Sequence, residues 1–107
     1  MKSSDYVYDL ILSIDSNVEP AILTFGSLLF DFLNPTTLTF DFDRFRLEAK
    51  KYMLYSEKNI CKTFEFLEKN NLIYYSERNN KYYASDFVIN VLYKGMKWIF
   101  QREEKKH

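Results

Sequence analysis

The stretch from Ser56 to Ile73 constrains the fold of this chain more than any other, because it combines a helix start, an amphipathic interior and a helix stop. A serine hydroxyl at the first of these positions can accept a hydrogen bond from a backbone N–H in the first helical turn. Apolar side chains then recur at helical spacing at Ile60, Phe64 and Leu67. Asn70-Asn71 indicates the end, since asparagine tolerates the left-handed conformation that closes many helices. We therefore predict a helix over residues 56–71.

Two short strand patterns follow this helix directly. Residues 72–75 read LIYY and residues 81–84 read KYYA, and both are rich in the aromatic and branched side chains that favour strands. The turn residues Arg78, Asn79 and Asn80 stand between them. These features predict a β-hairpin over residues 72–84.

Two helices are predicted before this region. Residues 4–14 place apolar side chains at helical spacing, and we expect Ser4 to cap them. Pro20 stands where a second helix begins, a position at which the missing N–H of proline costs nothing. Residues 21–33 are apolar nearly all round, which indicates a central, buried helix that ends at Asn34-Pro35.

A short strand and a third helix are predicted next. Leu38, Phe40 and Phe42 alternate with polar residues, as in a half-buried strand. We expect Asp43 to cap a helix that reaches about residue 52, with Phe42 and Leu47 in contact across its first turn. The side chains expected to face inward from this helix include Phe45, Leu47 and Ala49.

The last helix is expected over residues 86–104, with Ser85 as its cap. The predicted order is then helix, helix, strand, helix, turn, helix, hairpin and helix. This is the order of a winged helix-turn-helix with N- and C-terminal flanking helices, a mainly α fold with a small β-hairpin (α+β). We expect one domain over residues 1–107, with its winged-helix core at 20–84 and a C-terminal helix at 85–107. Apolar residues make up 47% of the 107, enough for a folded core.

The residue inventory argues against catalysis and metal binding. Cys61 is the only cysteine and His107 the only histidine, so the chain has no internal disulfide, no thiolate metal site and no Ser-His-Asp arrangement. We expect no enzyme, no metal and no cofactor. The N-terminus carries no apolar signal segment, and the longest apolar region, 21–33, is too short to span a bilayer. We therefore expect a cytoplasmic protein without a membrane partner.

Charge is distributed unevenly along the chain although the total is zero. Residues 1–43 hold one lysine and seven carboxylates, a net charge of −6. Residues 44–62 hold six basic and two acidic side chains, a net charge of +4. The basic excess therefore coincides with the two helices on either side of the predicted turn, as expected for a surface that meets nucleic acid.

Residues 20–95 resemble the winged-helix proteins related to RepL-type plasmid replication proteins, and the helix pattern also resembles MarR-like regulators. The resemblance is carried by PAILTFGSLLFDFLN, LTFDFDRFRLEAKKYMLY, SEKNICKTFEFLEKNNLI and KYYASDFVINVLYKG. The chain departs from that pattern with Asn59 in place of the usual threonine and Asn71 in place of the usual glycine. The resemblance implies sequence-specific binding of double-stranded DNA, by a transcriptional regulator or a plasmid or virus replication or partition factor associated with the nucleoid or a plasmid.

In such a protein the 56–71 helix enters the major groove and the 72–84 wing reaches a neighbouring groove or phosphate. Basic side chains contact phosphates or guanine, and asparagine pairs with adenine. The residues expected at the DNA are Arg44, Arg46, Lys50, Lys51, Ser56, Lys58, Asn59, Lys62, Arg78, Asn79, Asn80 and Lys81.

The C-terminal helix carries an apolar stripe that needs a partner. We expect a homodimer, with the alternative that the helix packs on residues 4–14 of its own chain. The residues expected at the dimer interface are Val88, Val91, Leu92, Gly95, Met96 and Ile99. A second function also stays open: Glu57 and Glu65 dilute the basic surface, so the chain is alternatively a winged-helix protein-interaction module that does not bind DNA.

Overall fold

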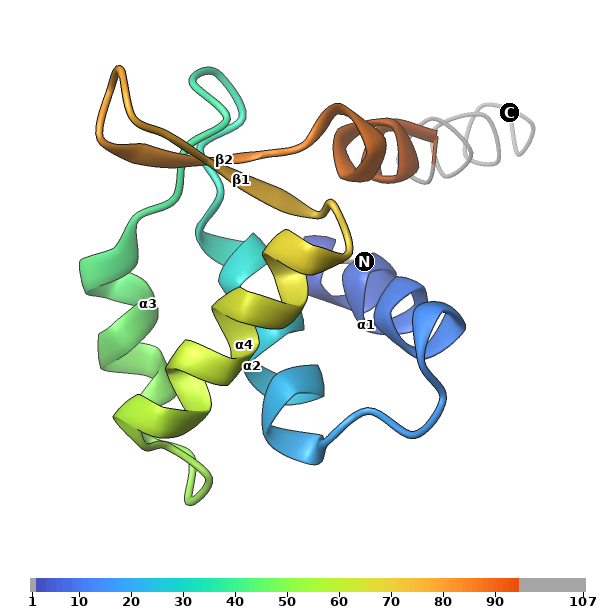
Figure 1. The fold of residues 1–107 in the computed structure, drawn as a ribbon, viewed down its shortest axis with the longest axis vertical. Helices are drawn as coiled ribbons and strands as arrows, with labels where there is room; N and C mark the ends of the chain where they lie inside the picture. The colour runs from blue at the N-terminus through green and yellow to red at the C-terminus, as the bar shows by residue number, and fades with distance from the viewer. Residues whose placement is uncertain (1, 95–107) are drawn as a thin grey trace, which may run out of the picture.

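A computed structural model describes residues 2–94 of the chain (Figure 1). Its elements are α1 (Ser3–Ile14), α2 (Pro20–Leu29), the 3-10 turn η1 (Phe30–Phe32), α3 (Phe42–Ala49), α4 (Glu57–Lys69), β1 (Ile73–Ser76) and β2 (Lys81–Ala84). Residues 86–94 are also helical. The described chain is therefore mainly helical with a two-stranded antiparallel sheet, an α+β fold, and this part of the prediction is confirmed.

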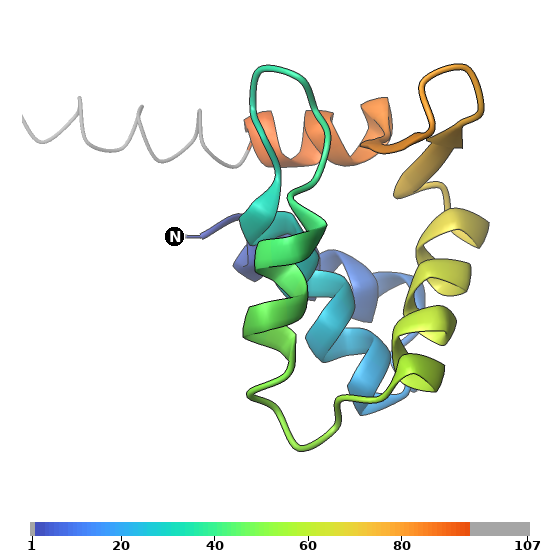
Figure 2. The same cartoon turned by 90° about the vertical axis from the view of Figure 1, so that its left-hand side faces the viewer.

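The central helix is α2, as its apolar sequence indicated. It contacts α1, α3 and α4, and Figure 2 shows it between α3 and α4. Phe25 and Leu29 are fully buried in the cluster that joins all these helices. Pro20 is its first residue, as predicted, but the helix ends at Leu29 and the chain continues as a 3-10 turn where the sequence predicted helix up to residue 33.

Helix α4 forms as predicted. The Ser56 hydroxyl accepts a hydrogen bond from the Asn59 backbone N–H at 3.0 Å, so the expected cap is present. Its apolar stripe is buried at Ile60 and Leu67. Asn71 follows the helix with a φ of 59°, the left-handed conformation expected of the stop.

The hairpin is also confirmed, with a register that pairs Tyr74 with Tyr83 and Tyr75 with Tyr82. The segment before α3 lies beside β2, because Thr39 forms a bridge to Tyr83 and the Ala84 N–H donates to the Leu38 carbonyl at 3.0 Å. This segment forms bridges rather than the regular strand predicted over 38–42. The reason is local, since Leu38 adopts a φ of 62° and Phe42 already belongs to α3.

The start of α3 corrects a prediction. Asp41 caps this helix by accepting from the Arg44 N–H at 3.2 Å, so Asp43 lies within the first turn. The Phe42 ring is held 5.6 Å from Phe64 and 5.8 Å from Tyr82, and this contact fits a helix that starts at Phe42, before the predicted cap. The helix ends at Ala49, short of the predicted residue 52.

Two further predictions are wrong, one for an inward side chain and one for a helix cap. Leu47 was expected to face inward from α3 but is 67% exposed, whereas Phe45 and Ala49 are buried as predicted. At the N-terminus, α1 begins at Ser3 and the Lys2 N–H donates to the Asp5 carboxylate at 3.0 Å, so Ser4 is not the cap.

The helix after the hairpin is capped as predicted, with the Val88 N–H donating to the Ser85 hydroxyl at 3.2 Å. Val88 and Leu92 are buried in the same core cluster as Val7 and Ile11 of α1. The part of the helix that carries these two residues therefore belongs to the core of its own chain. Val91 is half-buried, and the predicted interface residues Gly95, Met96 and Ile99 lie outside the described residues. Among the helices of residues 2–94, none is long and apolar enough to cross a membrane.

Candidate nucleic-acid interface

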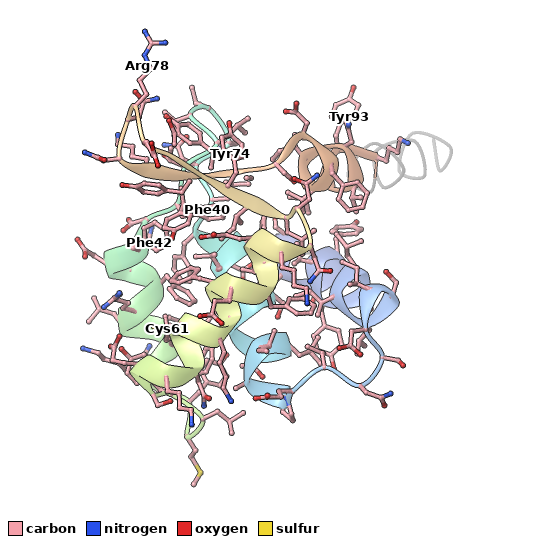
Figure 3. All side chains as sticks on the ribbon, in the orientation of Figure 1. Phe40, Phe42, Cys61, Tyr74, Arg78 and Tyr93 are labelled. Atoms are coloured by element: carbon pink, nitrogen blue, oxygen red, sulfur yellow. The ribbon has the colours of Figure 1, made fainter. Side chains whose placement is uncertain are left out.

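The outward stripe of α4 is less basic than its sequence suggested. Lys58, Cys61, Glu65 and Glu68 follow one another along the exposed side of the helix, and Figure 3 shows Cys61 on that side. Positive charge is therefore concentrated at the start of this stripe. Two carboxylates occupy its second half, where sequence periodicity had indicated a phosphate-facing surface.

Lys62 does not share the open position of Lys58. Its ammonium lies 3.5 Å from the Glu19 carboxylate at the start of α2, and its side chain is 39% exposed. This ion pair crosses from α4 to the neighbouring helix. The two lysines predicted to face DNA therefore differ in their surroundings: Lys58 is exposed, and the ammonium of Lys62 contacts Glu19 at the start of α2.

Asn59 and Ser56 hold the turn before α4 together. The Asn59 side-chain amide donates to the Leu54 carbonyl at 2.7 Å, and its backbone N–H donates to the Ser56 hydroxyl. The donor that would recognise adenine is therefore occupied within the chain. Among the four residues predicted on α4 and its cap, Lys58 is the one whose charged end the described structure leaves without a partner.

The two arginines of α3 contact different neighbours, Arg46 reaching α4 and Arg44 reaching η1. Arg46 is 3.8 Å from the Glu57 carboxylate, with the two side chains 48% and 67% exposed. The Arg44 guanidinium lies 5.6 Å from the ring centre of Phe32. Exposed ion pairs contribute little free energy, so a phosphate can replace the carboxylate at Arg46 with small loss.

The turn between α3 and α4 exposes the two lysines predicted there together with apolar side chains that sequence reasoning missed. Lys50 and Lys51 are exposed, and Lys51 pairs with Glu48 at 3.0 Å. Tyr52, Met53 and Leu54 follow and are also exposed, Met53 completely. The sequence analysis predicted helix up to about residue 52 and a plain turn after it, so it did not predict an exposed apolar surface at this point.

The hairpin tip presents Arg78 and Lys81 to solvent, and Figure 3 shows Arg78 projecting from it. Both asparagines of the tip have structural contacts. The Tyr75 hydroxyl donates to the Asn80 side chain at 3.0 Å, and the Asn79 amide donates to the Tyr83 hydroxyl at 3.0 Å. Asn80 also has a φ of 53°. The asparagines therefore shape the tip, while the two cations are available to a ligand.

An open groove of 630 Å³ lies between the hairpin and the start of α3. Its walls are aromatic: the Tyr82 ring stacks on Phe64, with centres 5.5 Å apart and planes 10° apart. Burial raises the pKa of Tyr82, and the neighbouring Glu68 carboxylate raises it further. Charged side chains of both signs stand at its rim, from Asp41, Asp43, Arg46 and Lys81.

The predicted DNA contacts fall into two groups, one around the α3–α4 turn and one at the hairpin tip. The α3–α4 turn with Lys58 lies at one end of the molecule and the hairpin tip at the other, with α4 between them (Figure 1). Within residues 2–94 no group of three or more His, Cys, Asp or Glu side chains is placed to hold a metal ion.

Comparison of the chain with protein-family models, curated proteins and solved structures finds no match.

Proposed function

We propose that this chain is a winged helix-turn-helix protein that binds double-stranded DNA. The order α2, α3, α4, β1, β2 is that of a winged helix, with α3 and α4 as the two helices of the helix-turn-helix. The bridge from Thr39 to Tyr83 supports the proposal further, because it places the segment before α3 against the second hairpin strand, as a third strand would be.

The observation that carries the DNA assignment is the position of the exposed cations relative to α4. Lys58 lies in the first turn of α4 and Lys50 at the end of α3, before the turn into α4, whereas Arg78 and Lys81 belong to the hairpin that follows α4. Phosphates border a DNA groove on both sides. A helix that lies in the groove is therefore favoured by basic side chains near each of its two ends, where they can reach the two phosphate backbones. In this proposal α4 enters the major groove and the hairpin tip contacts a neighbouring phosphate or minor groove.

The protein-interaction alternative is supported by a different observation. Leu47, Met53 and Leu54 are large apolar side chains exposed near the α3–α4 turn. Exposed apolar side chains gathered in one region are typical of surfaces that bind another protein. This alternative predicts binding that depends on these side chains and changes little with salt.

The two functions separate in a salt titration of DNA binding. We would measure fluorescence anisotropy of a labelled mixed-sequence duplex at several salt concentrations, for the full chain and for Lys58→Ala. Each lost phosphate contact reduces the slope of log affinity against log salt by about 0.9. We expect Lys58→Ala to bind more weakly with a slope reduced by about that amount.

A matched variant controls for the loss of charge itself. Lys2→Ala removes the same charge from the start of α1. It should retain the salt slope of the unmodified chain. An absence of duplex binding at low salt would refute the DNA proposal, and equal losses in Lys58→Ala and Lys2→Ala would refute the assignment to α4.

A further inference from the structure

The outer face of the hairpin presents a stacked pair of tyrosines. Tyr74 and Tyr83 are cross-strand partners whose ring centres lie 5.6 Å apart with planes 15° apart. Tyr74 is 50% exposed, and Figure 3 shows it on the side of the hairpin away from α4. Successive strand residues face opposite sides, so Tyr75 and Tyr82 belong to the groove beneath. The outer pair is therefore separate from both the core and the groove.

Tyr83, the inner ring of this pair, is held on two sides. The Asn79 side-chain amide donates to the Tyr83 hydroxyl at 3.0 Å, and the backbone of Tyr83 forms a bridge to Thr39 on its other side. A flat aromatic surface that is already ordered loses little conformational entropy when a ligand stacks on it.

The charge beside the pair is positive. Lys81 precedes Tyr83 by two residues on the same strand and also borders the groove, so it lies at the edge of the hairpin between the two faces, and Arg78 projects from the tip. Glu77 is the single carboxylate between residues 73 and 84. The hairpin thus offers an exposed aromatic ring together with an excess of cations, a combination that suits a ligand with flat rings and phosphates.

We propose that the outer face of the hairpin binds unpaired bases of single-stranded nucleic acid, with a base stacked on Tyr74 and the backbone phosphates near Lys81 and Arg78. Aromatic side chains in a basic setting bind single strands in this way, and any base can stack. A duplex does not offer this contact, because its base faces are covered by neighbouring bases. The inference goes beyond duplex binding. It shares Arg78 and Lys81 with the duplex proposal but depends on Tyr74, which that proposal does not use.

The test compares two substitutions of Tyr74 in the full chain. Tyr74→Phe keeps the ring, and Tyr74→Leu keeps an apolar side chain but removes the aromatic surface. Anisotropy would be measured on labelled oligonucleotides of about 12 nucleotides, a length within the usual range for single-strand binding modules. One sequence would be used as single-stranded DNA, as RNA and as blunt duplex DNA.

We expect Tyr74→Phe to bind the single strand like the unmodified chain and Tyr74→Leu to bind it about tenfold more weakly. Thermal unfolding by circular dichroism checks that both variants are folded. With a sequence that contains no thymine or uracil, the DNA and RNA strands differ only in the 2′-hydroxyl, so tighter binding of one of them assigns the natural strand.

Lys58→Ala separates this inference from the duplex proposal. It should weaken duplex binding and leave single-strand binding unchanged, whereas Tyr74→Leu should do the reverse. No binding to either single strand, or equal binding by Tyr74→Leu and Tyr74→Phe, would overturn the inference whatever the duplex result. Failure of duplex binding alone would overturn only the proposal made for α4.

Discussion

Gly26 lies where α2 packs against both α1 and α4. Gly26→Ala tests whether this packing leaves room for one more methyl group. A Cβ at this position would lie 3.0 Å from Ile11 Cδ1 and 3.4 Å from Leu67 Cδ2. Both neighbours are fully buried, so neither can move into solvent to make room. We therefore expect the alanine variant to be less stable, even though alanine favours a helix more than glycine does.

The magnitude follows from two opposing terms. Adding a methyl group to a filled core costs about 1–3 kcal/mol. Replacing glycine by alanine inside a helix recovers about 1 kcal/mol. The net effect is a free energy of unfolding lowered by about 1 kcal/mol, which for a domain of this size lowers the melting temperature by roughly 4 °C. Urea unfolding followed by circular dichroism measures the free energy directly.

Ile11→Val tests whether Ile11 Cδ1 causes the expected loss of stability in Gly26→Ala, because valine lacks the methyl group that the new Cβ would meet. Alone, this substitution should cost about 1 kcal/mol through the lost methyl. Combined with Gly26→Ala it should cost less than the sum of the two single changes, by about 1 kcal/mol in a double-mutant cycle. A more stable Gly26→Ala variant, or strictly additive effects, would refute this account of the helix crossing.

Three further expectations concern α4 and its neighbours. Ser56→Ala should lower stability by about 1 kcal/mol in urea unfolding while Ser56→Asp retains it, because either side chain but not alanine caps the helix; equal losses would contradict the capping role. Asn71→Gly should raise stability by about 0.5 kcal/mol, since glycine adopts the observed positive φ without a Cβ clash, and a loss would contradict this. Burial and Glu68 raise the folded-state pKa of Tyr82 above 10.0, so its contribution to stability is present below about pH 10 and lost as pH rises further. Tyr82→Phe should therefore lose less stability between pH 10 and 11 than the unmodified chain, and identical pH profiles would argue against this effect.

The features that the sequence predicted well are those set by neighbouring residues. Ser56 caps α4, Asn71 closes it and the hairpin register follows from two strands of equal length around a short turn. Each of these depends on side chains within a few positions along the chain, so periodicity and capping rules are sufficient.

The wrong predictions concern features that depend on contacts between residues far apart in the sequence. Asp41 and Asp43 are both suitable caps, and the contacts of Phe42 with Phe64 and Tyr82 accompany the choice of Asp41. The same limit applies to the candidate interface. The partner of Lys62 is Glu19, which lies 43 residues earlier, so helical spacing correctly placed Lys62 one turn from Lys58 but could not predict that its ammonium contacts α2.

The carboxylates on α4 also bear on how DNA would be read. Glu65 and Glu68 lie between the cations at the start of the helix and those of the hairpin. A duplex that met both groups of cations would place its phosphates at the two edges and its base edges in the middle. Carboxylates there accept hydrogen bonds from cytosine N4 and repel phosphates, so they favour a groove over a strand backbone. In the proposed complex, the carboxylate of Glu65 in the second half of α4 would favour sites that place cytosine opposite it. A protein partner on the same surface would instead need its own positive charge there.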